Sequence, residues 1–218
     1  MGSRDDGNAR ARRRMVEQQL TRRGIEDPRV LAAMGEVPRA EFVAAEHRSA
    51  AYDDMPLPIG EGQTISQPYV VAYMAEALEL REEDRVLEVG TGSGYAAAVL
   101  GRIVAEVFSV ERHRELAESA AERLQRLGYD NVHVRCGDGT RGWPEEAPFD
   151  GIMVSAGAPS IGDSLLAQLA PGGRLIIPVG PDPSSQELLR VRKTSDGGTS
   201  EERFGAVRFV PLLGEEGW

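Results

Sequence analysis

The spacing of apolar positions changes partway along the chain. In the first 50 residues apolar side chains recur at helical spacing, as at Met15, Leu20 and Ile25. Asp27 and Pro28 then predict the N-cap and first turn of a second helix. Residues 50–67 are rich in proline and glycine and predict a loop, and helical spacing returns from residue 68 to residue 80.

Beyond residue 84 short apolar runs alternate with helical segments. Strands are predicted at residues 85–89, 106–110, 132–136, 151–155 and 174–180. Helices are predicted after the first strand to about residue 104, and at residues 112–127 and 164–170. Residues 187–193 and 203–212 flank a polar turn, which indicates a hairpin.

Repeated strand–helix units predict an α/β fold with a doubly wound, mostly parallel sheet. We expect N-terminal helices and a C-terminal antiparallel strand pair to be added to this Rossmann-like core. Residues 1–14 are interpreted as a flexible tail and residues 15–218 as a single domain. Its parts are a helical and loop region at 15–67, a core at 68–183 and the final strands at 184–218.

Composition narrows the class of partner. The chain has 218 residues, 41% of them apolar, and a formal net charge of −10, which argues against nucleic acid or an anionic membrane surface as a partner. Cys136 is the only cysteine, so no intrachain disulfide can form. We expect Cys136 to lie in a buried strand. No apolar run reaches the length of a membrane span, and the N-terminus lacks the apolar segment of a signal peptide. These features predict a cytoplasmic protein.

The strongest local motif is VLEVGTGSGYAAAVL at residues 86–100. Gly90, Gly92 and Gly94 stand between an apolar strand and an alanine-rich helix, where glycines allow a tight turn and close approach to a ligand. A plain strand–helix turn would need only one glycine. The spacing is G-x-G-x-G, whereas a dinucleotide site has G-x-G-x-x-G.

Three acidic residues lie in or directly after strands near this loop. Glu88 precedes the glycines, where it would repel pyrophosphate and suit a cationic amino group. Glu111 ends the next strand, where a carboxylate can accept hydrogen bonds from ribose hydroxyls, although it is also a plausible solvated residue. Asp138, beside Gly139, could accept a bond from an adenine amino group, although Asp-Gly pairs are usually turns. Together they favour S-adenosylmethionine as the ligand.

With these motifs in place, the sequence resembles the protein-L-isoaspartate O-methyltransferase family over roughly residues 15–213. The resemblance is carried by MVEQQLTRRGI, VPRAEFV, DMPLPIGEGQTISQPYVVAYMAEALEL, the glycine loop, FDGIMVSAGAP, LAQLAPGGRLIIPVG and VRFVPL. The segment PLPIGEGQTISQP is the most specific of these. Serine and glycine in VSAGAP replace the threonine and alanine of many members.

The resemblance implies methyl transfer from S-adenosylmethionine to the free α-carboxyl of L-isoaspartyl residues in damaged proteins, which initiates their repair. It places the active-site serine at Ser66. Cofactor contacts fall on Gln63, Thr64, Ile65, Glu88, Gly90, Gly92, Gly94, Glu111, Asp138 and Gly139. An extended peptide is expected against Ile65, Ser66, Val210 and Leu212. We expect no metal, and a monomer.

Such a site needs no general base. An α-carboxyl titrates near 3.3–3.7, so the acceptor is already ionised at neutral pH. The enzyme's task is to align the reacting atoms, and Ser66 can donate to the carboxylate at a helix N-terminus. On sequence alone an N-cap is the better interpretation of Ser66, and the two roles are compatible because the cap position would place the hydroxyl beside the anion.

Three other functions compete with this interpretation. The acceptor could be a small molecule or a nucleic acid, although the acidic charge and the SAGAP segment disfavour a base-amine site. The chain could bind damaged carboxylates without methylating them, which the retained Ser66 argues against. A nicotinamide-dependent dehydrogenase is disfavoured by the glycine spacing.

Overall fold

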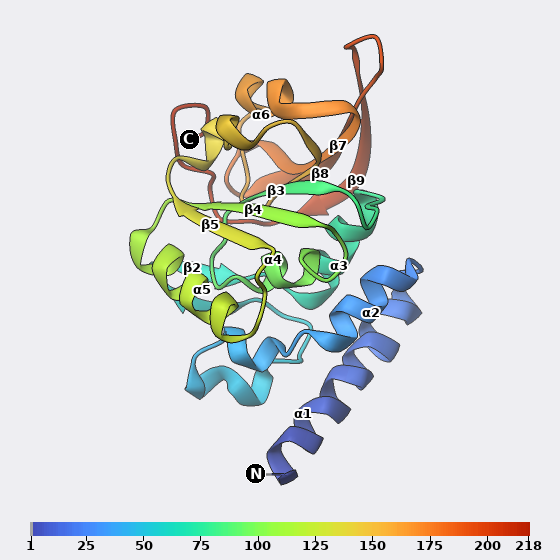
Figure 1. Ribbon diagram of the computed structural model, residues 1–218, viewed down its shortest axis with the longest axis vertical. Helices are drawn as coiled ribbons and strands as arrows, with labels where there is room; N and C mark the ends of the chain where they lie inside the picture. Colours follow the sequence, from blue (N-terminus) through green and yellow to red (C-terminus); the bar gives the residue numbers. More distant parts are fainter. Residues whose placement is uncertain (1) are drawn as a thin grey trace.

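The structure is a computed structural model that describes residues 2–218. Its main feature is a seven-stranded sheet in the order β5-β4-β3-β6-β7-β8-β9 (Figure 1). The strands are β3 (Arg85–Val89), β4 (Glu106–Glu111), β5 (Val132–Cys136), β6 (Phe149–Val154), β7 (Leu169–Asp182), β8 (Ser185–Lys193) and β9 (Thr199–Val207). Neighbours from β5 to β7 pair in parallel, while β8 is antiparallel to both β7 and β9. The predicted fold class is confirmed.

Helices and short turns surround this sheet. The α-helices are α1 (Gly2–Met15), α2 (Pro28–Glu36), α3 (Pro68–Ala77), α4 (Tyr95–Leu100), α5 (Arg114–Arg126) and α6 (Asp163–Gln168). A π-helix spans Val16–Leu20, and 3-10 turns span Thr21–Arg23, Arg39–Phe42, Ala45–Ala50, Gly139–Arg141 and Pro144–Glu146. Asp27 caps α2 and Pro28 opens it, as predicted.

The two faces of the sheet bury two separate apolar clusters. Along each central strand, side chains alternate between the faces, so Val86 and Val107 enter one cluster while Leu87 and Phe108 enter the other. The first cluster packs against α3, α4, Leu124 of α5 and the N-terminal helices; the second packs against α6. Figure 1 shows α4 and α5 on one side of the sheet and α6 on the other. The sheet is therefore covered on both faces.

The strand order predicts a ligand site at the carboxyl ends of the central strands. From β3 the chain proceeds outward to β4 and β5, and then returns to the other side of β3 to form β6. In open α/β sheets, ligands bind at the carboxyl ends of strands where the order reverses. The ends of β3, β4 and β6 therefore define the expected position.

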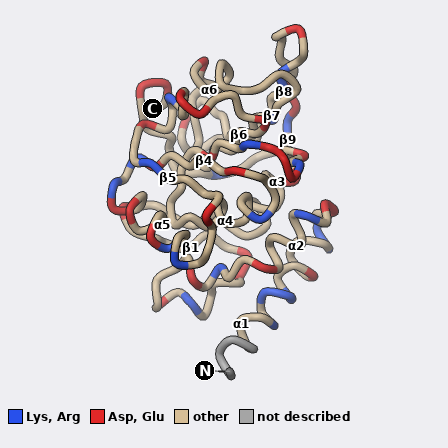
Figure 2. The backbone as a smooth tube through the Cα atoms, in the orientation of Figure 1, with Lys and Arg blue, Asp and Glu red and all other residues tan. Residues whose placement is uncertain are grey.

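Acidic and basic residues are interspersed over the molecule (Figure 2).

Several local predictions are wrong. Residues 57–67, predicted as a loop, contain an antiparallel hairpin of β1 (Leu57–Gly60) and β2 (Gln63–Ile65). Strand β7 begins at Leu169, directly after α6, whereas the sequence predicts a helix to residue 170 and a strand only from residue 174. The last strand ends at Val207 instead of continuing to residue 212. Cys136 ends β5 and is exposed, because the strand lies at the sheet edge.

The N-terminal segment also differs from its prediction. Residues 1–14 are predicted as a loose tail, but residues 2–15 form α1. Tertiary contact outweighs the polar composition there: the Arg12 Nε atom donates to the Gly35 carbonyl of α2 at 2.6 Å, and Ala11 packs on the core. The division of the rest of the chain into three parts stays a prediction.

Candidate active site

The loop between β3 and α4 turns tightly through three glycines. Gly90, Gly92 and Gly94 adopt φ angles of 93°, 52° and 86°, a region that residues with a Cβ rarely enter. The Gly90 amide donates to the Val110 carbonyl of β4 at 2.9 Å, which fixes the loop to the sheet. The loop borders a pocket with about 800 Å³ of empty space, its open mouth included.

Glu88 is fully buried in the wall of this pocket. The Ser109 hydroxyl donates to its Oε2 atom at 2.5 Å, whereas Oε1 has no hydrogen-bond partner of normal geometry among the described residues. Burial raises the pKa of Glu88 to about 8, although the Ser109 hydroxyl and the Ala97 amide favour the charged form. A buried oxygen without a partner is an acceptor that a ligand's cationic amino group would satisfy.

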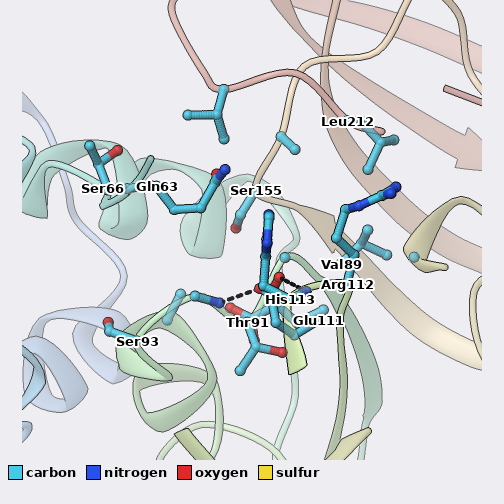
Figure 3. Close-up of a pocket in the computed structure, with 18 of the residues that line it drawn as sticks. Gln63, Ser66, Val89, Thr91, Ser93, Glu111, Arg112, His113, Ser155 and Leu212 are labelled. Carbon is cyan, nitrogen blue, oxygen red and sulfur yellow. Dashed lines mark hydrogen bonds between the residues drawn. The ribbon is translucent and has the colours of Figure 1, made fainter. Parts of the chain in front are cut away.

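Glu111 ends β4 at the opposite side of the glycine loop. Its Oε2 atom accepts from the Gly92 amide at 2.8 Å, and Oε1 accepts from the His113 amide at 2.9 Å (Figure 3). The carboxylate therefore joins the loop to the start of α5. Each oxygen keeps a further lone pair, so the group can still accept from ligand hydroxyls, as the sequence predicts for ribose.

The structure separates the two residues of the predicted adenine contact. Gly139 lines the pocket, but Asp138 does not. The Asp138 Oδ1 atom accepts from the Thr140 amide at 2.9 Å, and Oδ2 accepts from the Glu215 amide at 2.9 Å. Partial burial opposes ionisation, but the hydrogen bonds from Glu215 and Thr140 outweigh it and lower the pKa of Asp138. The role of Asp138 as an adenine ligand stays a prediction.

Strand β2 reaches the pocket from another direction. Its residues Gln63, Thr64 and Ile65 all line the pocket, with the Ile65 side chain buried and Thr64 exposed. Figure 3 shows Gln63 on one side of the pocket, with Glu111 lying across from it. The hairpin thus supplies the wall facing the strand ends, where the sequence predicts backbone contacts to the cofactor.

A second cavity adjoins the pocket and opens to solvent. It comprises about 2000 Å³ of empty space, open solvent included, between α3 and the chain that follows β9. Five residues line both cavities, namely Thr64, Ser66, Ser155, Val210 and Pro211. Half-buried Ser66 therefore lies where a ligand in the pocket and a molecule in the groove would meet.

Ser66 is not the N-cap of α3. Gln67 holds that position, and its own side chain makes no capping hydrogen bond. The Tyr69 amide, in the first turn of α3, instead donates to the Asp54 Oδ1 atom at 3.0 Å. The alternative interpretation of Ser66 as a cap is therefore wrong, and its hydroxyl is not engaged in capping.

The predicted substrate residues near the C-terminus lie on extended chain after β9. Residues 208–212 are anchored by a bridge between Gly157 and Pro211. Val210 lines both cavities, while buried Leu212 lines only the cofactor-side pocket. A peptide contact by Val210 fits this geometry better than one by Leu212, and both stay predictions.

Comparison with known proteins decides the family. A family model described as protein-L-isoaspartate(D-aspartate) O-methyltransferase (PCMT) matches residues 10–217. The chain belongs to this family. A protein-L-isoaspartate O-methyltransferase of Pelotomaculum thermopropionicum is 61% identical over 214 residues, which cover 98% of this chain and 93% of that protein. A relative from Marinobacter nauticus, protein-L-isoaspartate O-methyltransferase 2, is 59% identical over 95% of this chain and 94% of its own length.

Solved structures of isoaspartate methyltransferases have the same fold. A protein-L-isoaspartate O-methyltransferase superposes with a TM-score of 0.86 at 34% identity, covering 94% of this chain and 67% of that one. A putative family member from Plasmodium falciparum, solved in complex with S-adenosyl-L-homocysteine, gives a TM-score of 0.80 at 29% identity, covering 93% and 98%. The resemblance noted in the sequence is thereby confirmed, as is S-adenosylmethionine as the family's cofactor.

Sequence reasoning missed several residues of this methyltransferase site. Ser155 follows β6 and contributes a second serine where the cavities meet. Its position after a strand at the switch point was a usable signal. His113 and Arg112 line the pocket because they follow Glu111 directly. Asp54 lines neither cavity but contacts the residues that follow Ser66, and it offers no local signal because these partners are more than ten residues away.

Among residues 2–218, no group of three or more His, Cys, Asp or Glu side chains is arranged to hold a metal ion. Within the same residues, none of the helices combines the length and apolar character needed to cross a membrane.

Proposed function

We propose that this chain transfers a methyl group from S-adenosylmethionine to the free α-carboxyl of L-isoaspartyl residues in damaged proteins, which initiates their repair. The observation that carries the proposal is the position of Ser66 between two cavities. One cavity suits a nucleoside with a cationic group, and the other is an open groove suited to a polypeptide. Family membership supplies the substrate class.

The residues of the pocket fit the cofactor. Glu88 presents a buried oxygen without a partner of normal geometry among residues 2–218, and Glu111 can accept from hydroxyls beside the glycine loop. The glycines keep this part of the wall free of side chains, and Gly139 extends it. When bound, S-adenosylmethionine supplies a methyl group activated by the positive charge on its sulfur.

The acceptor needs no proton removed by the enzyme. An α-carboxyl with a pKa near 3.3–3.7 is ionised at neutral pH, so general base catalysis has nothing to act on. The five residues that the two cavities share include two serines and a threonine, and none of the five has a carboxylate or imidazole side chain. The enzyme's remaining task is to align the carboxylate oxygen with the methyl group. Orientation of the reactants alone can lower a reaction barrier by up to roughly 7–11 kcal/mol.

Ser66 would orient the acceptor. Its hydroxyl is free of the capping role, so it can donate to one carboxylate oxygen in the groove. Ser155 offers a second hydroxyl at the same junction. Val210 and the chain around it would contact an extended peptide through main-chain groups, which accommodates isoaspartate in varied sequences. Action as a cytoplasmic monomer, without nucleic-acid or membrane partners, stays a prediction.

The function is tested with a labelled methyl donor and two peptides of identical sequence that contain either isoaspartate or aspartate. We expect base-labile label on the isoaspartyl peptide alone. Equal labelling of both peptides, or of neither, would contradict the proposal. Labelling of a nucleic acid or small molecule instead would favour a different acceptor.

The role of Ser66 is tested by Ser66→Ala. Loss of one hydrogen bond to a charged group costs about 1.5–3 kcal/mol, so turnover should fall about ten- to a hundredfold. Affinity for S-adenosylhomocysteine, measured by calorimetry, should stay at the parent value because the pocket is intact. Ser195→Ala, in the exposed turn between β8 and β9 and outside the lining of both cavities, is the control and should leave both quantities unchanged. Full activity of Ser66→Ala would rule out the role.

A further inference from the structure

The Asp54 carboxylate binds three groups at the start of α3. Its Oδ1 atom accepts from the Tyr69 amide at 3.0 Å, and Oδ2 accepts from the Gln67 side-chain amide at 2.6 Å. Oδ2 also forms an ion pair with Arg23, whose guanidinium lies 3.5 Å from the centre of the Tyr69 ring. Because Pro68 has no N–H, the Tyr69 amide is the first donor that this helix offers. Asp54 therefore caps α3 from fifteen residues upstream.

A buried arginine holds the turn that carries Asp54. Arg39 is 0% exposed, and its Nε atom donates to the Ala51 carbonyl at 2.7 Å. Its Nη2 atom donates to the Met55 carbonyl at 3.3 Å. These two bonds hold the backbone on both sides of Asp54. A carboxylate fixed in this way can impose a position on the groups that it binds.

We infer that Asp54 is a positioning residue for Ser66, an inference that rests on the function proposed above. Asp54 binds the side chain of Gln67, the residue directly after Ser66, and the amide of Tyr69. These contacts fix where the chain leaves Ser66 and enters α3. Both Asp54 oxygens already accept hydrogen bonds, and Oδ2 also pairs with the Arg23 guanidinium. Asp54 thus acts through the placement of the Ser66 hydroxyl.

Two substitutions separate this role from simple stabilisation. Asp54→Ala removes both hydrogen bonds, so kcat for an isoaspartyl peptide should fall at least about tenfold, since misplacement by ~1 Å can cost 10²-fold. The KM for S-adenosylmethionine and the affinity for S-adenosylhomocysteine should stay close to the parent values. Asp54→Asn keeps the acceptor for Tyr69, and a turned Gln67 amide restores the second bond. It should retain most of the parent kcat.

Asp27→Ala is the matched control. Asp27 caps α2 by accepting from the Arg29 amide at 2.8 Å and pairs with the Arg29 guanidinium. It lies outside the lining of both cavities. Its loss should lower Tm by an amount comparable to that for Asp54→Ala, while kcat measured well below Tm stays unchanged.

The outcomes are distinct. Parent-like kcat in Asp54→Ala, an equal loss in Asp27→Ala, or an Asp54→Asn variant as slow as Asp54→Ala would each overturn the positioning role. A parent chain that fails to methylate isoaspartyl peptide would contradict the proposed function instead. A fall in kcat confined to Asp54→Ala, with rescue by asparagine, supports the inference.

Discussion

Glu88 and Glu111 lie near the carboxyl ends of the neighbouring strands β3 and β4, yet their carboxyl groups have different surroundings. Both oxygens of Glu111 accept hydrogen bonds from backbone amides. Glu88 is fully buried, and its Oε1 atom has no hydrogen-bond partner of normal geometry among the described residues. With a pKa raised to about 8, the Glu88 side chain is mostly protonated at neutral pH in the free chain. The charged carboxylate that the sequence suggests for a cationic ligand therefore requires loss of this proton when the ligand binds.

The Glu88 proton should be visible in the pH dependence of stability. Its ordinary pKa of 4.5 applies in the unfolded chain, and its folded value is about 8. Between these values the folded state holds a proton that the unfolded state has released, so the stability contributed by Glu88 falls as pH rises. Urea unfolding of the ligand-free chain should therefore show a larger loss from pH 5.5 to 8.5 than in Glu88→Gln. Parallel curves would show that Glu88 titrates normally.

At the scale of elements, the β1–β2 hairpin forms a wall over the glycine loop. Ile59 of β1 lies so close that a Cβ on Gly92 would stand 3.1 Å from its Cδ1 atom. At the hairpin turn, Glu61 Oε2 lies 3.6 Å from His113 Nδ1 at the start of α5. The hairpin therefore contacts both the loop and the helix that enclose the pocket, and Gln63 extends from it into the pocket.

This packing predicts the effect of Gly92→Ala. The φ angle of 52° imposes strain of about 1–2 kcal/mol on any residue with a Cβ, and the new methyl group meets Ile59. Calorimetry should show weaker binding of S-adenosylhomocysteine together with a lower Tm. Gly128→Ala, at φ 77° with open space around it and away from the pocket, isolates the strain. It should lower Tm without changing affinity, and equal affinity in both variants would contradict the contact.

Elements with strong periodicity could be predicted, and those that depend on distant partners could not. Strands β3 to β6 are short apolar runs, and three glycines between β3 and α4 marked the pocket. The β1–β2 hairpin is only a few residues per strand and contains Pro58, so it had no strand pattern. Helix α1 depends on contacts such as that of Arg12 with Gly35. The capping of α3 was assigned to Ser66 because local rules do not reveal Asp54.

At the scale of the whole molecule, the C-terminal segment formed by residues 213–218 connects parts of the chain that are far apart in the sequence. The Glu215 amide donates to Asp138 after β5, and the Trp218 Nε1 atom donates to the Gly157 carbonyl after β6 at 3.0 Å. Figure 1 shows the C-terminus beside α6, at the opposite end of the molecule from α1. Leu213, which begins this segment, still lines the cofactor-side pocket. The segment therefore encloses the side of the pocket where adenine is predicted.

Deletion of residues 214–218 should weaken cofactor binding through Asp138. If Asp138 acts by holding this segment, Asp138→Ala and the deletion remove the same interaction, and their combined effect on S-adenosylhomocysteine affinity should not exceed the larger single effect. A double-mutant cycle between contacting groups then gives a coupling energy of about 0.5–3 kcal/mol. Additive losses would instead show that Asp138 contacts the ligand independently of the segment. Tm should be measured for the parent, the two single variants and the combined variant. A chain that is partly unfolded at the assay temperature would lose affinity for that reason alone.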